Sequence, residues 1–330
     1  MTSKTKVDLN SAKITEIFEN LGYTVKSEPQ PVTDGEFNTI FSVSTDKGDF
    51  MIKLSPNNEN HILTYEKEIM KREIGFYKLI AEKTDIPVPR VLHSDFSRKE
   101  APCDWFIMDK IEGKTLDKTD LTPEEKKSFT IEILAKLHEI SGEGFGYNGE
   151  YADWHEGIYK MVECIYNDGV KKLNEKKNPI LKADLKLGRR FMDIINKNEK
   201  LLKSVKSTIV NFDLWEKNMI YSPDGKVYLI DPERTFYGDF IGDFNSLNIM
   251  GTPLSKLQKE VKEYADKSGR ALKIGKEESI RFDIMYAYLC FLMAIEKYYR
   301  YSFTDFGFIR NWFMSLLLKN TLKRIESYEK

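Results

Sequence analysis

One β-rich stretch, residues 209–234, interrupts a half of the chain that otherwise has the sequence pattern of helices. The stretch, IVNFDLWEKNMIYSPDGKVYLIDPER, has two short runs typical of strands on either side of Pro223–Asp224–Gly225, a strong turn sequence. An antiparallel hairpin centred between the Asp and the Gly of this turn would place Asn218 opposite Asp231, with Cβ atoms about 5 Å apart. An amide oxygen and a carboxylate at that separation can share Mg²⁺, which prefers oxygen ligands.

The loop that enters this hairpin carries Asp213, five residues before Asn218. A carboxylate at this position could accept the proton of a substrate hydroxyl during phosphoryl transfer, or orient that hydroxyl. From this segment alone, an ordinary polar loop with Asx turns is an equally good interpretation. Residues in the N-terminal part of the chain favour the interpretation of Asp213 as a catalytic residue.

The first hundred residues mix helix and strand. Residues 8–23 have apolar residues at helical spacing, and residues 37–55 read as a hairpin of two β-rich runs. In the second run the residues at 50, 52 and 54 are apolar and share one face, which leaves Met51 and Lys53 on the other. Lys53 could therefore hold a phosphate group, and Met51 could pack on a nucleotide base.

A long helix is expected next, over residues 59–83, and the prolines of IPVPRVL end it. Glu73 lies within its apolar row, between Ile69 and Phe76. An acid embedded in an apolar stripe needs a buried partner, and Lys53 is the obvious one.

The pattern changes after WFIMDKIEGKTL, residues 105–116, a short apolar strand followed by a turn. We place the domain border there: residues 1–108 form an N-terminal lobe, 109–113 a connection and 114–330 a mainly helical lobe, which makes the fold class α+β. One helix, 122–140, opens with a capping box, and further helices are expected over 181–206, 277–300 and 307–328.

Composition excludes several function classes. The net charge of −1 argues against a nucleic-acid binder. The longest apolar run, residues 284–295, is too short to span a bilayer and is expected to be a buried core helix, so no membrane association is expected. Three widely spaced cysteines and the lack of a signal-peptide pattern favour a reducing cytoplasmic location.

The motifs in their order resemble the aminoglycoside phosphotransferase and choline kinase group. Lys53 and Glu73 are followed by IPVPRVL, FIMDKIEGKTL, LAKLHEISGEGFG, NFDLWEKN and LIDPE, and the likeness runs from about residue 30 to 250. The resemblance implies a protein-kinase-like two-lobed fold and transfer of the γ-phosphate of ATP, with Mg²⁺, to a hydroxyl of a small molecule.

The resemblance also implies roles for individual residues in the N-terminal lobe. Lys53 would hold the nucleotide phosphates, and Glu73 would pair with it, with Glu66 as the less favoured alternative. The nucleotide loop would be TDGEFNTIF (33–41), in which Gly35 is the only glycine. The segment Asp109–Lys110–Ile111 would offer backbone groups to adenine.

In the second lobe the resemblance implies that Asp213 is the catalytic base and that Asn218 and Asp231 bind Mg²⁺. Asp243 matches a structural acid of the group, and His138 matches a recurring structural Leu-His pair.

Two departures from the group keep alternatives open. Asn211 stands where the group usually has His, although an amide can also donate and accept hydrogen bonds. The nucleotide loop is poor in glycine, so its phosphate cradle is weakly specified. The alternatives are a nucleotide-binding pseudokinase or interaction module, and a two-domain binding protein without nucleotide.

The acceptor is expected to be a small molecule, because Asp243 follows Asp231 by only twelve positions, too few for a protein-kinase activation segment. Residues 211–243 hold seven acids against three bases, which modestly favours a cationic acceptor. Four aromatic residues could face an amine or simply pack between lobes: Trp154, Trp215, Phe236 and Tyr237. The identity of the acceptor, a preference for ATP or GTP, and the oligomeric state stay open.

Overall fold

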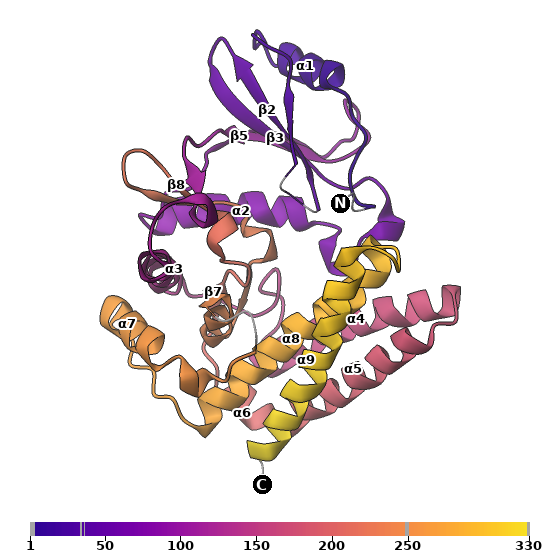
Figure 1. Cartoon of the computed structure of the whole chain (residues 1–330), viewed down its shortest axis with the longest axis vertical. Helices are drawn as coiled ribbons and strands as arrows, with labels where there is room; N and C mark the ends of the chain where they lie inside the picture. Colours follow the sequence, from indigo (N-terminus) through magenta and orange to yellow (C-terminus); the bar gives the residue numbers. More distant parts are fainter. Residues whose placement is uncertain (1–3, 34, 36, 248–250, 329–330) are drawn as a thin grey trace.

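The computed structural model describes residues 4–33, 35, 37–247 and 251–328. Its N-terminal part is built around a five-stranded antiparallel sheet with the order β1-β2-β3-β5-β4. Figure 1 shows this sheet at the top of the molecule, above the helical remainder. The strands are β1 (Gln30–Val32), β2 (Thr39–Thr45), β3 (Gly48–Leu54), β4 (Val91–Asp95) and β5 (Trp105–Asp109).

Helices cover both faces of this sheet. On one face α1 (Ser11–Asn20) packs against a core that includes Ile52, and on the other α2 (Ile69–Lys83) packs against Phe106. The two cores follow from the alternation of side chains along each strand. The predicted hairpin over 37–55 and its two faces are confirmed.

The predicted helix over 59–83 is correct only in its second part. Two single turns of 3₁₀ helix, Glu59–His61 and Thr64–Glu66, precede α2. The carboxylate of Asp168 accepts hydrogen bonds from the backbone N–H of Thr64 at 2.7 Å and from its hydroxyl at 2.6 Å. These bonds fix the chain in a separate turn, so the α-helix begins only after it.

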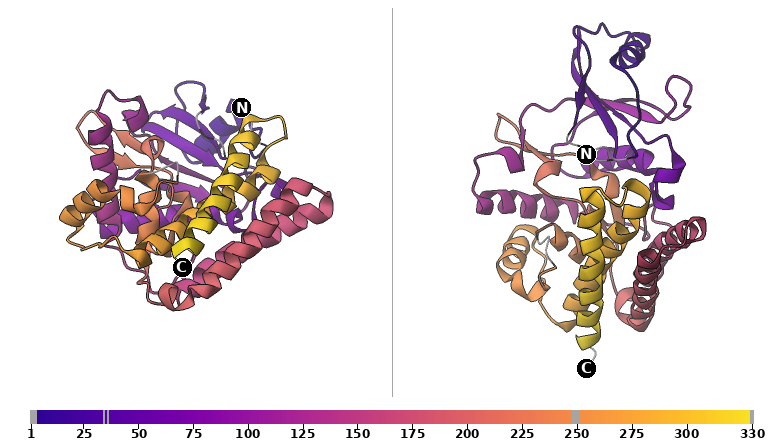
Figure 2. Two further views of the ribbon diagram at one scale, coloured as in Figure 1. Left: turned by 60° about the horizontal axis from the view of Figure 1, so that its bottom comes forward. Right: turned by 45° about the vertical axis from the view of Figure 1, so that its right-hand side comes forward.

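The C-terminal part is mainly helical, as expected. Helix α3 opens with the predicted capping box of Thr122 and Glu125, and the expected helix over 181–206 is divided at Asn198 into α5 and α6. The helices are α3 (Pro123–Leu137), α4 (Trp154–Glu175), α5 (Pro179–Lys197), α6 (Glu199–Lys203), α7 (Gln258–Ser268), α8 (Lys276–Arg300) and α9 (Phe306–Tyr328). Figure 2 shows α4 and α5 as one pair and α8 and α9 as another, with α9 on the outside.

Most of α8 is buried, which confirms the prediction of a core helix over 284–295. Among the described residues, no helix combines the length and apolar character needed to cross a bilayer.

Two small sheets carry the loops that matter for chemistry. β7 (Thr208–Val210) pairs with β10 (Phe236–Gly238), and β6 (Lys114–Thr115) pairs with β8 (Met219–Tyr221), which pairs with β9 (Val227–Leu229). The segments 211–218 and 230–235 leave these strands on the side of α2. The second of these segments contacts Lys53 through Asp231 and Glu233.

Candidate active site

Lys53 and Glu73 form a buried ion pair, as the sequence predicted. The Lys53 ammonium donates to both Glu73 carboxylate oxygens, at 2.9 and 2.8 Å, and the two side chains are 2% and 1% exposed. The alternative partner, Glu66, is wrong because its carboxylate pairs with Arg300 instead.

Two further carboxylates reach the same ammonium group. Lys53 Nζ lies 2.5 Å from Asp231 Oδ1 and 3.0 Å from Glu233 Oε2. Burial by itself lowers the pKa of Lys53, but the three acids outweigh burial and raise that pKa well above its usual value. Burial raises the pKa of Glu73 to about 8. The charge of Lys53 lowers this pKa, but the nearby charges of Asp231 and Glu233 raise it again. Lys53 therefore stays charged.

The hairpin register differs from the prediction by one residue. Ser222 and Lys226 close a three-residue loop in which Gly225 is left-handed, so the hairpin centres on Asp224. Asn218 consequently lies opposite Ile230, whose N–H donates to the Asn218 carbonyl at 2.9 Å. The prediction that Asn218 faces Asp231 across the hairpin is wrong, because the turn is one residue longer than a two-residue loop.

Asp231 reaches Lys53 through an unusual backbone conformation. Its φ of 57° and ψ of 50° are left-handed, and its N–H donates to the Tyr77 hydroxyl at 2.7 Å. A non-glycine residue in this conformation requires support from its surroundings, and Tyr77 on α2 supplies it. The turn brings the next acid, Glu233, to the same lysine.

The side chain of Asn218 holds Asp213 through both its backbone carbonyl and its carboxylate. The Asn218 side-chain amide donates to the Asp213 carbonyl at 2.8 Å and to its carboxylate at 3.3 Å. With the amide nitrogen committed to Asp213, the amide oxygen of Asn218 is the atom that can bind a cation.

The Asn211 side-chain amide both donates and accepts a hydrogen bond in the structure, and so braces the loop that carries Asp213. Its side-chain oxygen accepts the Asp213 N–H at 3.2 Å, and its nitrogen lies 3.5 Å from the Thr235 hydroxyl, to which it donates. Its own N–H donates to the buried carboxylate of Asp243 at 2.9 Å. Asp243 also accepts the Phe212 N–H at 2.6 Å and contacts His138, so both residues are structural, as expected.

The electrostatics of Asp213 suit proton transfer. Burial raises the pKa of its carboxyl to about 7, the guanidinium of Arg234 lowers it, and the charge of Asp231 raises it further. Arg234 Nε lies 3.8 Å from Asp213 Oδ2. The Asp213 side chain is still 30% exposed, so a substrate can reach it.

A chain of alternating charges runs from this site to the N-terminal part of the molecule. Arg234 pairs with Glu296 at 2.9 Å, Glu296 with Arg300 at 3.1 Å, and Arg300 with Glu66. The guanidinium of Arg300 also lies 4.6 Å from the ring centroid of Phe37 in the nucleotide loop. Arg300, the last residue of α8, thus joins the helical part of the molecule to both the loop and the turn before α2.

The expected nucleotide loop, residues 33–41, is anchored at its second half. Asn38 donates from its side chain to Glu233 at 2.8 Å, and the Thr5 hydroxyl donates to the Phe37 carbonyl at 2.9 Å. The predicted Gly35 has ordinary space for a Cβ, with its nearest neighbours at 3.8 Å, so nothing steric requires glycine there. Residues 34 and 36 lie outside the described residues.

The expected adenine-binding segment is partly engaged within the protein. The N–H groups of Asp109 and Lys110 donate to the carbonyls of Arg90 and Asp49, at 3.1 and 3.2 Å. Within the described part of the chain the Ile111 N–H has no such acceptor. Met51 is partly buried in the core under α2.

The aromatic residues divide into two kinds. Trp154 and Phe236 are fully buried and stack on each other at 5.9 Å, so they pack the helical core and do not face an acceptor. Trp215, two residues after Asp213, is 42% exposed.

Sequence reasoning missed three residues of the site: Glu233, Arg234 and Asn38. The spacing of two between Asp231 and Glu233 is a usable signal in the sequence for the first of these. Arg234 and Asn38 gave no signal, because their partners are far away in the chain.

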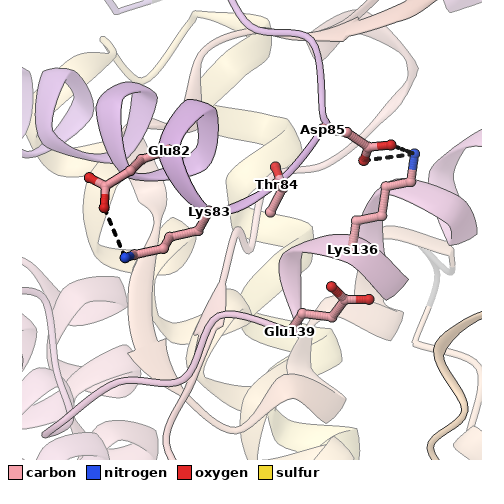
Figure 3. Close-up of a pocket in the computed structure, with 6 residues that line it drawn as sticks. All are labelled: Glu82, Lys83, Thr84, Asp85, Lys136 and Glu139. Atoms are coloured by element: carbon pink, nitrogen blue, oxygen red, sulfur yellow. Dashed lines mark hydrogen bonds and ion pairs between the residues drawn. The ribbon is translucent and has the colours of Figure 1, made fainter.

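A cavity of about 500 Å³ lies away from this site, between the end of α2 and the end of α3 (Figure 3). Two ion pairs lie among its charged residues: Glu82 pairs with Lys83 at 2.8 Å and Lys136 with Asp85 at 3.1 Å. None of the residues around Lys53 or Asp213 lines it. We assign it no function.

The model of the phosphotransferase enzyme family matches residues 28–271. The chain belongs to this family. No curated protein sequence matches the chain significantly.

Several solved structures resemble most of the chain. Choline kinase LicA from Streptococcus pneumoniae has a TM-score of 0.64 at 17% identity, covering 95% of this chain and 99% of that one. A thermostable mutant of aminoglycoside phosphotransferase APH(4)-Ia, in ternary complex with AMP-PNP and hygromycin B, has a TM-score of 0.63 at 13% identity, covering 94% and 97%. The streptomycin–ATP–APH(2")-IIa ternary complex has a TM-score of 0.60 at 16% identity, covering 97% and 99%. The fold of this family member is therefore protein-kinase-like and α+β, as the resemblance implied.

Proposed function

We propose that this family member transfers the γ-phosphoryl group of ATP, with Mg²⁺, to a hydroxyl of a small molecule. The observation that carries the proposal is the convergence of the Glu73, Asp231 and Glu233 carboxylates within 3.0 Å of the Lys53 ammonium group, next to the loop that holds Asp213. Phosphoryl transfer depends on such fixed charges more than on covalent chemistry.

The residues present fit the two cofactors. Oxygen ligands suited to Mg²⁺ come from Asp231, from Glu233 and from the amide oxygen of Asn218. Carboxylate oxygens of Glu73, Asp231 and Glu233 lie within 4.8 Å of one another, a spacing compatible with a shared cation. When bound, the metal ion would neutralise charge on the phosphate oxygens. Lys53 would hold those phosphates, with Met51, Asp109 and Ile111 at the base and Gly35 in the loop above.

In the proposed mechanism Asp213 accepts the proton of the acceptor hydroxyl. A pKa of about 7 suits a base that acts near neutral pH. Asn211 and Asn218 fix the backbone on either side of this carboxylate, so its orientation is set before the acceptor binds. Lys53 keeps its positive charge throughout, and this charge favours binding of the anionic phosphate groups over binding of a neutral ligand.

The proposed division of the chain assigns nucleotide binding to residues 1–108, the connection to 109–113, and acceptor binding to 114–330. The acidic balance of residues 211–243 and the exposed Trp215 favour an acceptor that carries a positive charge, such as an amino-sugar, an aminoglycoside or a choline-like amine. We place the protein in the cytoplasm, where ATP is abundant.

The test measures ADP release from Mg·ATP by the purified protein with pools of hydroxyl compounds. We expect one pool to stimulate release and Asp213→Asn to lower kcat by about 10²- to 10⁴-fold with nucleotide affinity nearly unchanged. Asp231→Asn should remove the Mg²⁺ dependence together with the activity. The matched control is Asp224→Asn, an exposed carboxylate in the same hairpin, which should leave the rate unchanged.

ATP binding without ADP release from any pool would instead favour a nucleotide-binding pseudokinase. Equal loss of ATP binding in both Asp213→Asn and Asp231→Asn would show that the roles of the two acids are misassigned. No ATP binding by the wild type would contradict the proposal altogether.

A further inference from the structure

Helix α9 has two apolar faces, and only one of them is covered. Its inner face is buried, largely against α8, through residues that include Phe308, Met314, Leu318, Leu322 and Ile325. Its outer face is also apolar in the first half of the helix. A helix that is apolar all round is normally buried all round, so the outer face of α9 lacks a covering surface.

We define the outer patch by six exposed residues: Phe303, Phe306, Ile309, Trp312, Phe313 and Leu316. Among the described residues, eight large hydrophobic side chains are exposed, and these six are the ones that lie within fourteen consecutive positions. The spacing of three and four along the helix places the five residues from Phe306 to Leu316 on one continuous face, and Phe303 lies in the turn just before it. Figures 1 and 2 show α9 on the outside of the molecule, with no other element in front of its first half.

The patch is close in size to a standard protein interface. The six side chains keep between 40% and 59% of their surface exposed. Since large apolar side chains present roughly 200 Å² each, the patch offers about 600 Å². This is the upper end of what monomeric proteins leave exposed, and it approaches the roughly 800 Å² that each partner buries in a standard interface.

The order of residues along the patch points to a second copy of this chain. In a twofold contact between antiparallel helices, positions at equal distances from the axis face each other. Phe306 and Leu316 are centred on position 311, and so are Ile309 and Phe313. We infer that the outer patch of α9 is a homodimer interface, in which Phe306 of one copy packs on Leu316 of the other and Ile309 packs on Phe313.

The charges at the ends of the patch agree with this arrangement. Asp305 lies just before the first turn of α9, and the exposed Lys319 lies one turn beyond Leu316. The antiparallel contact would bring Asp305 of one copy close to Lys319 of the other, an opposite-charge pair at each end. A phospholipid surface would gain nothing from this symmetry, so we favour the second copy over a membrane.

The test is the mass of the full-length protein in solution, measured by light scattering after gel filtration from about 1 µM to about 200 µM. We expect twice the chain mass of 38.5 kDa at high concentration. Ile309→Glu and Phe313→Glu, each near the proposed axis, should both return the mass to that of one chain. Lys323→Glu is the matched control, because it changes an exposed residue of the same helix beyond the patch and should leave the dimer intact.

Circular dichroism of each variant establishes that the fold is retained, which is expected because both substituted side chains are at least 40% exposed. A wild-type protein that remains a monomer at the highest concentration would overturn the inference. A dimer that persists in both variants would place the interface elsewhere and overturn it too. Flotation of a monomeric protein with phospholipid vesicles would assign the patch to a membrane instead.

Discussion

Removing the guanidinium of Arg300 should destabilise the protein strongly, because Arg300 is the cation that compensates Glu66. Glu66 is fully buried, and besides Arg300 it accepts the Leu63 N–H at 2.7 Å. Glu296, the second partner, would retain Arg234. Leaving one buried carboxylate without its cation typically costs about 3–5 kcal/mol, so we expect Arg300→Met to lower the free energy of unfolding by about that amount.

The double variant Glu66→Gln/Arg300→Met separates the charge from the packing. A neutral amide at position 66 can still accept the backbone hydrogen bond and no longer needs a cation. We therefore expect the double variant to recover about 2 kcal/mol of the loss, as the coupling energy of a contacting pair.

The pH dependence gives a second signature. Burial raises the pKa of Glu66, and Arg300 opposes that rise. Without Arg300 the folded state takes up a proton at Glu66 more readily than the unfolded state does, so the variant gains stability as pH falls. The loss caused by Arg300→Met should therefore be smaller at pH 5 than at pH 8.

Urea denaturation followed by circular dichroism measures these free energies. Arg190→Met is the matched control, because Arg190 pairs with a half-exposed Glu326 and should cost less than about 1 kcal/mol. The reasoning would be refuted if Arg300→Met costs no more than the control, or if the double variant is no more stable than Arg300→Met.

Three further outcomes are expected. In the free enzyme kcat/KM should rise with pH and level off above about 7, because Asp213, whose pKa is raised to about 7, must lose its proton to act as a base. Arg234→Met should move this rise to higher pH, because the guanidinium lowers the pKa of Asp213. A profile that is flat from pH 5.5 to 9 would contradict the prediction. Asn211→Ala removes the acceptor of the Asp213 N–H and should lower kcat about 10- to 100-fold at unchanged KM for ATP, in steady-state kinetics. Gly113→Ala should lower the midpoint of thermal unfolding, because φ of Gly113 is 143° and the new Cβ would lie 2.3 Å from a backbone carbonyl oxygen of β8. Gly75→Ala in α2 is the control and should not lower it, because no atom lies within 4 Å of the new Cβ.

The part of the site that depends on local pattern could be predicted from the sequence. The alternation along β3 placed Lys53 away from the apolar face, and the apolar row of α2 made Glu73 need a partner. Two short-range patterns were therefore sufficient to pair them. Local pattern also predicted the capping box at Thr122.

Other parts could not be predicted because they depend on exact turn length or on distant residues. A two-residue and a three-residue loop at Pro223–Gly225 differ little in sequence, yet they change which residue faces Asn218. Nothing local indicates that Glu66 pairs with Arg300, or that Asn38 reaches Glu233. The apolar run over 284–295 predicted a buried helix correctly. No pattern indicated that Arg300, the last residue of this helix, would contact Phe37 in the expected nucleotide loop.

The large sequence separation between Arg300 and its partner Glu66 affects the order in which the parts of the structure can form during synthesis. Arg300 follows Glu66 by 234 residues, and Asp231 follows Lys53 by 178. At a synthesis rate of about 5–20 residues per second, Glu66 emerges roughly 10–50 s before its cation does. The sheet and its helix α1 can form early from nearby residues. The charged centre beneath the sheet is completed only when the end of α8 arrives, so a chain that stops short of Arg300 would carry a folded sheet over an unfinished site.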